Sequence, residues 1–505
     1  RGDAHLPLQR RSCRLAGQDR NGARQSNPRC TSKKRAEIES KIHEVGAKKI
    51  IRPYLLFTSN QMEQNRDNYA FLTEGPIHRV IGTMAVPTII SMLVLSLYNM
   101  ADTFFVGRID TQSTAAIGIV FSVMFLVQAI SFFFGNGSGN YISRELGARR
   151  HRNAEVMATT GFVYAVAGGL LILIAGELFL TPLSRWLGST PTILPYTRTY
   201  LGITLLGTPL VTGAFTLNNQ MRFQGNAVYA MRGIATGAIL NVALDPLFIF
   251  VFNMGIAGAA VSTVIGQAVS FVILLRMTHR GGSIRIRLQN FSPSKVYIQE
   301  IMAGGTPSLS RQGLSSLATV MLNYGAGAYG DAAIAGMSVV NRFTMILLAA
   351  VIGFGQGFQP FCGFCYGARL YERVKDGFWY AVRVSTLFLL VCSVIGWIFS
   401  DHIIVLFRRD PAVVAVGTVA LKWQLASLPL TGLIILGNMF TQTIRKTIRA
   451  NILAAARSGL FFIPLMMILP NTFGLMGVEM CQTVSDVLAF SLTLPILHSA
   501  FREMR

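Results

Sequence analysis

Long apolar runs constrain the fold of this 505-residue chain more than any other feature of its sequence. An α-helix rises about 1.5 Å per residue, so about 20 apolar residues cross the roughly 30 Å hydrocarbon core of a membrane. A helix also satisfies its own backbone polar groups there. The sequence therefore predicts an all-α integral membrane protein with twelve transmembrane helices. The runs lie at about residues 79–101, 114–140, 156–180, 197–221, 230–252, 256–277, 298–324, 333–358, 376–399, 412–440, 449–469 and 474–498.

Charged residues are few and unevenly placed. Asp, Glu, Lys and Arg make up 13% of the chain, against about 25% in soluble domains. The net charge of +22 would suit a nucleic-acid-binding protein. However, the excess of Lys and Arg lies in residues 1–61 and in alternate loops between the apolar runs. Because positive residues favour cytoplasmic loops, this distribution predicts two cytoplasmic termini and no nucleic-acid partner.

An internal repeat divides the chain into two halves. Positions 220 residues apart match, as in Pro87 and Pro307, Pro209 and Pro429, and Gly147-Ala148-Arg149 and Gly367-Ala368-Arg369. Each half holds an even number of runs, so both halves enter the membrane in the same direction and are related by a pseudo-twofold axis along the membrane normal. The repeat predicts two homologous six-helix bundles with a cavity between them, which is an architecture of transporters.

The runs and the repeat together predict the domain organisation, with two fused halves that form a functional monomer. Residues 1–61 are basic and lack apolar periodicity. We interpret them as a disordered cytoplasmic extension, as an organellar transit segment or, in preference, as sequence ahead of a start at Met62. The expected segments are a cytoplasmic entry segment at 62–78, an N-lobe at 79–277, a cytoplasmic linker at 278–297 and a C-lobe at 298–499.

Two acidic residues within the apolar runs are candidates for ion binding, because an ionisable side chain at mid-membrane costs at least about 2.5–3.5 kcal/mol. Asp102 follows Tyr98 by four residues, and Asp245 follows Asn241 by four, so each pair shares a helix face. Burial and a second carboxylate both favour the protonated form of a carboxyl group. The two acids are therefore candidates to exchange protons or cations. The alternative is a pair of solvated carboxylates at helix ends.

The second half offers weaker candidates. Asp486 lies in the last run, and Arg342 in the eighth run is its candidate partner or a cavity-lining residue. Cys362 and Cys365 form a CxxC within an apolar run, but zinc sites need four convergent ligands and no His or acid lies nearby. We therefore expect no metal site and no cofactor.

Several stretches resemble the MATE (multidrug and toxic compound extrusion) family, in particular its DinF-like and MepA-like branch. The resemblance covers about residues 73–500 and depends on the combination of its motifs. They are residues 73–77 (TEGPI), 87–91 (PTIIS), 97–108 (LYNMADTFFVGR), 241–249 (NVALDPLFI), 255–260 (GIAGAA) and 357–360 (GFQP). One departure is residues 362–366 (CGFCY), where relatives often carry Gly-Tyr-Asn-Tyr.

The resemblance implies a transporter that exports amphiphilic, often cationic drugs or metabolites by alternating access, in exchange for H⁺ or Na⁺. It implies a location in the inner membrane of a bacterial or archaeal cell. It also implies a network that binds the coupling ion and a proline, Pro87, at which the first helix bends. The network residues are Tyr98, Asp102, Asn241, Asp245 and Thr263, with Asn218 or Asn219 as an extension.

Two other classes fit less well. A lipid-linked oligosaccharide flippase of a related exporter family would line its cavity with many basic residues, and few lie in the middle of a run here. An intramembrane transferase would need clustered acids for Mg²⁺ or a His–Asp pair within a run, and the sequence shows neither. We therefore expect a transporter and not an enzyme.

Overall fold

Long α-helices make up most of the part of the chain that the computed structural model describes, residues 68–279 and 283–504. These residues contain no β-strand. Ten helices are long and apolar enough to cross a membrane, and a bent pair counts as an eleventh. The predicted extension at 1–61 lies outside the described residues, and the entry segment is described only from residue 68, with a helical turn at 68–74 before Pro76.

The N-lobe contains six spans. Its fourth span is bent by 49° between α7 and α8, at a break that holds Gly207 and is followed by Pro209. Proline cannot donate a backbone hydrogen bond, so the helix bends where this donor is missing. The elements are α3 (Ile77–Val106), α4 (Thr111–Gly147), α5 (His151–Leu178), the short α6 (Leu180–Trp186), α7 (Leu194–Leu206), α8 (Thr208–Phe223), α9 (Ala227–Pro246) with a π-helical turn η1 (Leu247–Val251), and α10 (Gly255–Met277).

The C-lobe repeats this pattern. Its first helix, α11, is the twelfth span: it has 33 residues, ample to cross a membrane, but it is less apolar because it carries many Gly, Ser and Gln residues as well as Glu300 and Arg311. A π-helical turn, η3 (Ala456–Leu460), interrupts the fifth span of this lobe. The elements are α11 (Lys295–Gly327), α12 (Asp331–Gly367), α13 (Tyr371–Ile398), the short α14 (Ser400–Phe407), α15 (Pro411–Thr443), α16 (Thr447–Ala455), α17 (Phe462–Phe473) and α18 (Leu475–Arg502).

The predicted twelve-helix fold in two six-helix bundles is confirmed, and the main errors concern helix ends. Both α4 and α12 continue past the predicted ends at residues 140 and 358, to Gly147 and Gly367. The added turns are less apolar, yet their side chains are mostly buried. Packing therefore extends these two helices where hydropathy falls.

The repeat is visible in backbone and side-chain detail. Arg149 and Arg369 both adopt the left-handed conformation, with φ of 60° and 61°, which is uncommon for a residue other than glycine. The amide of Asn218 donates to the carbonyl of Ala230 at 2.8 Å. Its counterpart 220 residues later, Asn438, donates to Ala450 at 2.7 Å. The same tertiary contacts therefore shape both lobes.

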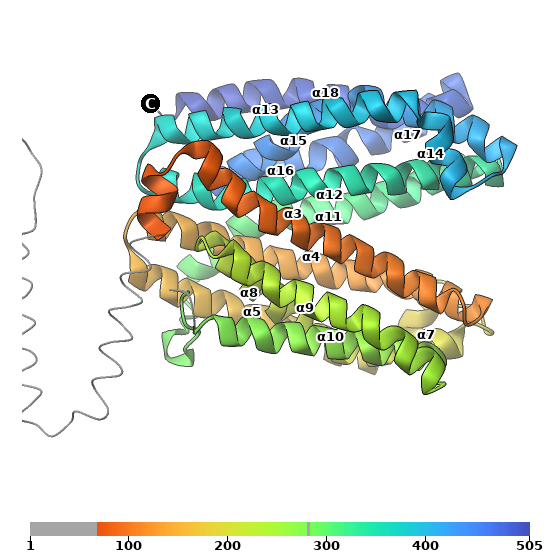
Figure 1. The fold of residues 1–505 in the computed structure, drawn as a ribbon, viewed down its shortest axis with the longest axis horizontal. Coiled ribbons are helices and arrows are strands. Elements are labelled where there is room, and N and C mark those ends of the chain that lie inside the picture. Colours follow the sequence, from red (N-terminus) through yellow and green to blue (C-terminus); the bar gives the residue numbers. More distant parts are fainter. Residues whose placement is uncertain (1–67, 280–282, 505) are drawn as a thin grey trace, which may run out of the picture. The chain divides into compact units, whose positions relative to one another are not determined.

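The first two helices of each lobe pack against the other lobe. Figure 1 shows α3 beside α12 and α4 beside α11. Glycines permit the close approach, since a Cβ at Gly357 would overlap the backbone of Ala85, and one at Gly137 would overlap that of Ile301. The hydroxyl of Thr88 on α3 also donates to the carbonyl of Gly353 on α12 at 2.7 Å.

Ion pairs join the lobes at the end of the bundle where α3 begins and α18 ends, which we call the terminal end (Figure 1). Glu300 of the C-lobe contacts Arg144 of the N-lobe at 2.9 Å and Arg445 of its own lobe at 2.6 Å. Arg144 also donates to the carbonyl of Thr443 at 2.8 Å. The terminal end is therefore closed by contacts between the two lobes.

The segment between the lobes packs against the N-lobe. The backbone N–H of Ile284 donates to the side-chain oxygen of Gln224 at 2.7 Å, and Arg152 donates to Asn290 at 2.7 Å. These contacts attach the connection to the terminal end of the bundle. It runs between the end of α10 at Met277 and the start of α11 at Lys295, and residues 280–282 in it are outside the described part.

Candidate ion-binding site

The two predicted acids lie together in the interior of the N-lobe. Asp102 is on α3 and 8% exposed, and Asp245 is on α9 and 0% exposed. They are close enough to interact electrostatically. This burial excludes the alternative of two solvated carboxylates at helix ends.

Polar side chains from α9 and α10 surround Asp245. The hydroxyl of Ser262 donates to Asp245 Oδ1. The amide of Asn241 lies 3.4 Å from the same oxygen and 3.2 Å from the hydroxyl of Thr263, to which it donates. Pro246 and the π-helical turn η1 follow at once. Such turns are frequent at functional sites, because they break the regular helical bonding.

Two tyrosines complete the site. The hydroxyl of Tyr200, on α7, donates to Asp102 Oδ2 at 3.3 Å. Tyr98, on α3, lies within interaction range of Thr263 and of both acids. Side chains from α3, α7, α9 and α10 therefore converge on one point within the lobe.

Three buried oxygen atoms of this site have no hydrogen-bond donor among the described residues: Asp102 Oδ1, Asp245 Oδ2 and Asn241 Oδ1. A buried acceptor without a donor costs about 1–3 kcal/mol, and more when it is charged. Protons on the carboxyl groups, or a cation that prefers oxygen ligands, would supply what these atoms lack. The described residues hold no group of three or more His, Cys, Asp or Glu that could bind a metal ion.

The structure brings all five residues of the predicted network together. It adds Tyr200 and Ser262, which the sequence did not indicate. Ser262 directly precedes Thr263, so an adjacent hydroxyl was visible, but Tyr200 lies 98 residues from Asp102 and nothing in the sequence links them.

The structure does not bring the predicted extension of the network to the two acids. The side-chain amide of Asn218 instead donates a hydrogen bond to the carbonyl of Ala230. Asn219 accepts a hydrogen bond from Arg222 at 2.6 Å and donates to the carbonyl of Phe215. Both asparagines therefore belong to the part of α8 that faces the start of α9 and the other lobe.

Pro87 is buried inside α3, which remains one helix from Ile77 to Val106. The hydroxyl of Ser91 donates to the carbonyl of Pro87 at 2.8 Å. The proline ring leaves the carbonyl one turn earlier, on Thr83, without its helical donor. This weak point lies where α3 crosses α12.

The predicted partner of Asp486 is wrong. Asp486 is 0% exposed, and Arg457 on η3 donates to its Oδ1 at 2.8 Å. Ser427 and Gln482 donate to the same carboxylate at 3.1 Å and 2.8 Å. Arg342 is instead an exposed residue of α12. Arg457 lies in the middle of an apolar run, so the rule that indicated Asp486 could have found it.

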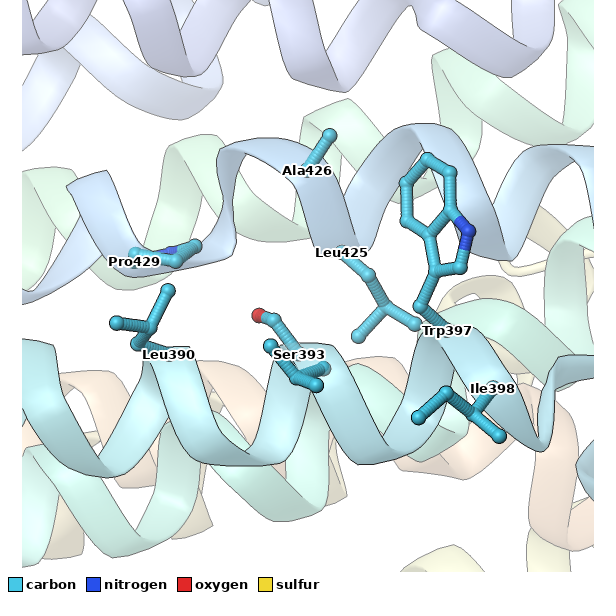
Figure 2. A pocket seen from close by; sticks show the side chains of 8 residues that line it. Leu390, Ser393, Trp397, Ile398, Leu425, Ala426 and Pro429 are labelled. Atoms are coloured by element: carbon cyan, nitrogen blue, oxygen red, sulfur yellow. The ribbon is translucent and has the colours of Figure 1, made fainter.

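A pocket of about 330 Å³ lies elsewhere, within the C-lobe. Figure 2 shows its lining, which comes from α13 and α15 and includes Leu390, Trp397 and Pro429. The lining is apolar except for Ser393, and it contains no ionisable group. This pocket is therefore not a second ion site.

Comparison with known proteins agrees with this architecture. The MatE family model matches the chain twice, at residues 87–247 and 307–468. The multidrug export protein MepA of Staphylococcus haemolyticus is 26% identical over 434 residues, which cover 85% of this chain and 95% of that protein.

Solved structures show the same fold. A MOP superfamily transporter from Pyrococcus furiosus, whose title reports a binding pocket of reverse polarity, is 24% identical with a TM-score of 0.81, covering 86% of this chain and 98% of that one. A MATE transporter in a bent conformation is 25% identical with a TM-score of 0.81, at the same coverage. With two family matches spaced as the repeat is, this chain belongs to the MatE family, and its curated relative MepA is a multidrug export protein.

Proposed function

We propose that this protein is an antiporter that exports amphiphilic drugs or metabolites in exchange for protons or sodium ions. The observation that carries the proposal is the buried pair Asp102 and Asp245, with one oxygen atom of each lacking a donor. If the two acids had only a structural role, their burial would cost free energy without any gain for the fold.

The proposed coupling acts through α3. Asp102 lies near one end of this helix, and the contacts of Ala85 and Thr88 with α12 lie nearer the other. Binding of a proton or cation changes the charge of the acid pair, and bending near Pro87 would transmit this change to the contact between the lobes. Substrate and ion must prefer different conformations, because a ligand with equal affinity for both shifts neither.

The proposed orientation places the terminal end in the cytoplasm. This assignment is supported by the positive-inside rule, because basic residues lie at the helix ends there, such as Arg150, Arg369 and Arg449. The lobes touch at this end, so we assign the structure to a state closed towards the cytoplasm. The proposed location is the inner membrane of a bacterial or archaeal cell, and the proposed functional unit is a monomer.

Transport in proteoliposomes tests the proposal. One set of vesicles contains the cationic dye rhodamine 123 and another the anionic dye fluorescein, and each receives either a pH gradient or a sodium gradient. We expect gradient-driven movement of at least one dye by the wild type. Asp245→Asn should abolish the gradient dependence without reducing membrane insertion. Asp331→Asn, which removes an exposed acid at the start of α12, is the matched control.

Two results would count against this function. If neither gradient moves either dye, the protein is not a coupled exporter of such compounds. If Asp245→Asn transports as the wild type does, Asp245 has no part in coupling.

A further inference from the structure

Arg222 is among the largest fully buried side chains of the described residues, with 1% of its surface exposed. It extends from α8 of the N-lobe and donates to the side-chain oxygen of Gln356 on α12 of the C-lobe. It also donates to Asn219 Oδ1 at 2.6 Å and to Asn136 Oδ1 at 3.3 Å. Its Nε is buried without an acceptor. Arg222 therefore lies between the lobes among neutral amides.

A second arginine lies near it from the other lobe. Arg311 on α11 is half-buried and within electrostatic reach of Arg222. Its described hydrogen bond, to Asn438 Oδ1, is long at 3.4 Å. Arg311 is therefore only partly covered, and this long hydrogen bond holds it weakly.

Neither arginine is paired with an acid. Among residues 68–279 and 283–504, no ion pair includes Arg222 or Arg311. Two other arginines that are only 12% and 18% exposed have an acidic partner: Arg144 contacts Glu300 at 2.9 Å, and Arg457 contacts Asp486 at 2.8 Å. Arg222 and Arg311 thus differ from these two arginines, because neither has an acidic partner within the described part of the chain.

The repeat shows that the fold does not require these charges. The residue equivalent to Arg222 in the C-lobe is Gln442, which donates to Gly304 and Ser308 at 2.6 Å and 2.8 Å. The residue equivalent to Arg311 in the N-lobe is Ser91. A neutral side chain therefore suffices at each equivalent position, and each lobe adds one arginine to the space between them.

Physical chemistry points to what these charges bind. A guanidinium group does not lose its proton in proteins, so burial cannot neutralise it. Amide oxygens accept hydrogen bonds from its N–H groups but do not neutralise its positive charge. The two guanidinium groups, which carry like charges, therefore repel each other. Its planar fork of donors matches a carboxylate, sulfonate or phosphate group. An anionic group placed between the arginines would attract both guanidinium groups and offset their mutual repulsion.

We propose that Arg222 and Arg311 recognise an anionic group on the exported compound, so that the substrates are amphiphiles with a carboxylate, sulfonate or phosphate group. This inference rests on the proposed export function. Separation of the lobes at the terminal end would break the contact between Arg222 and Gln356 and expose the guanidinium group to substrate. The family resemblance alone implies the opposite preference, for cations.

Binding of two dyes that share a xanthene ring system tests the inference. The full-length protein in detergent is titrated against fluorescein, which is anionic, and rhodamine 123, which is cationic, with fluorescence anisotropy as the readout. We expect the wild type to bind fluorescein more tightly. Arg311→Gln should weaken fluorescein binding about tenfold or more, the usual effect of losing a hydrogen bond to a charged group, and leave rhodamine 123 binding unchanged or stronger.

Further variants separate recognition from structure. Arg311→Lys keeps the charge and should retain part of the fluorescein affinity. Arg222→Gln reproduces the residue of the other lobe at that position and should show the same dye selectivity as Arg311→Gln. Arg383→Gln, which removes an exposed arginine of α13, is the control and should bind both dyes as the wild type does.

Several outcomes would overturn the inference: tighter binding of rhodamine 123 by the wild type, unchanged fluorescein binding by Arg311→Gln, or equal loss of both dyes in that variant. A failure of gradient-driven transport with intact, arginine-dependent fluorescein binding would instead refute the export function alone.

Vesicles with fluorescently labelled phosphatidylglycerol or phosphatidylcholine distinguish the source of the anion. Faster movement of the former between leaflets, lost in Arg311→Gln, indicates a lipid head group, and its absence alongside fluorescein binding indicates a soluble amphiphile.

Discussion

Arg457 and Asp486 show at the scale of single residues how this membrane protein stabilises a buried charge. Replacing Arg457 by Leu would leave the fully buried carboxylate of Asp486 without its cation, although Ser427 and Gln482 still donate to it. Breaking a buried pair in this way costs about 3–5 kcal/mol. We therefore expect a clear fall in the thermal unfolding temperature of Arg457→Leu, measured in detergent.

The double variant Arg457→Leu/Asp486→Leu removes both charges and should recover most of that loss, because no unpaired charge remains. Glu372→Gln is the control. It breaks the surface pair with Lys375, in which Glu372 is 83% exposed, and an exposed pair contributes only about 0–1 kcal/mol. A double variant as unstable as the single one would contradict this account.

The candidate site shows what residue patterns can and cannot predict. Tyr98 with Asp102 and Asn241 with Asp245 were accessible because four-residue spacing places each pair on one helix face. Only the family resemblance predicted that these two pairs, which lie on different helices, contact each other. Tyr200 was missed because a contact between distant segments leaves no pattern in the sequence. Arg457 was visible as a charge within an apolar run, but its pairing with Asp486 was not. The same reason explains why Arg342 was wrongly considered for Asp486.

At the scale of helices, hydropathy predicted the number of spans but not their ends. It also carries little information about helix packing, which here depends on glycine. The helix α12 approaches α3 of the other lobe at Gly357, where a Cβ would overlap the backbone of Ala85. Gly313 on α11 has no such neighbour within 4 Å. The two glycines therefore have different roles in helices of similar length.

Alanine substitutions at these two glycines should have opposite effects on stability. Gly357→Ala forces α3 and α12 apart, and overpacking of this kind costs about 1–3 kcal/mol. Gly313→Ala should stabilise the protein by up to about 1 kcal/mol, because alanine favours a helix more than glycine does. Thermal unfolding in detergent measures both. Equal shifts in the same direction would show that the close approach at Gly357 is not required.

At the scale of the whole molecule, the contacts of Glu300 link the lobes at the terminal end. Glu300 is 6% exposed and contacts Arg144 of the N-lobe and Arg445 of the C-lobe. At the same end, Cys365 on α12 is a buried free thiol in a core formed by residues of both lobes, and its sulfur lies 3.6 Å from the carbonyl of Leu72, to which it donates. Because both lobes cover this cysteine, its reactivity reports how often the terminal end opens.

Replacing Glu300 by Gln should open the terminal end more often, because Arg144 and Arg445 lose their shared carboxylate. In a background with the other five cysteines replaced, we expect Cys365 to react with a membrane-impermeant maleimide about tenfold faster, which corresponds to roughly 1.4 kcal/mol in the opening equilibrium. Glu155→Gln, which breaks an exposed pair with Arg152, should leave the rate unchanged. An unchanged rate in Glu300→Gln would mean that the glycine-mediated packing between the lobes, and not this ion pair, keeps the terminal end closed.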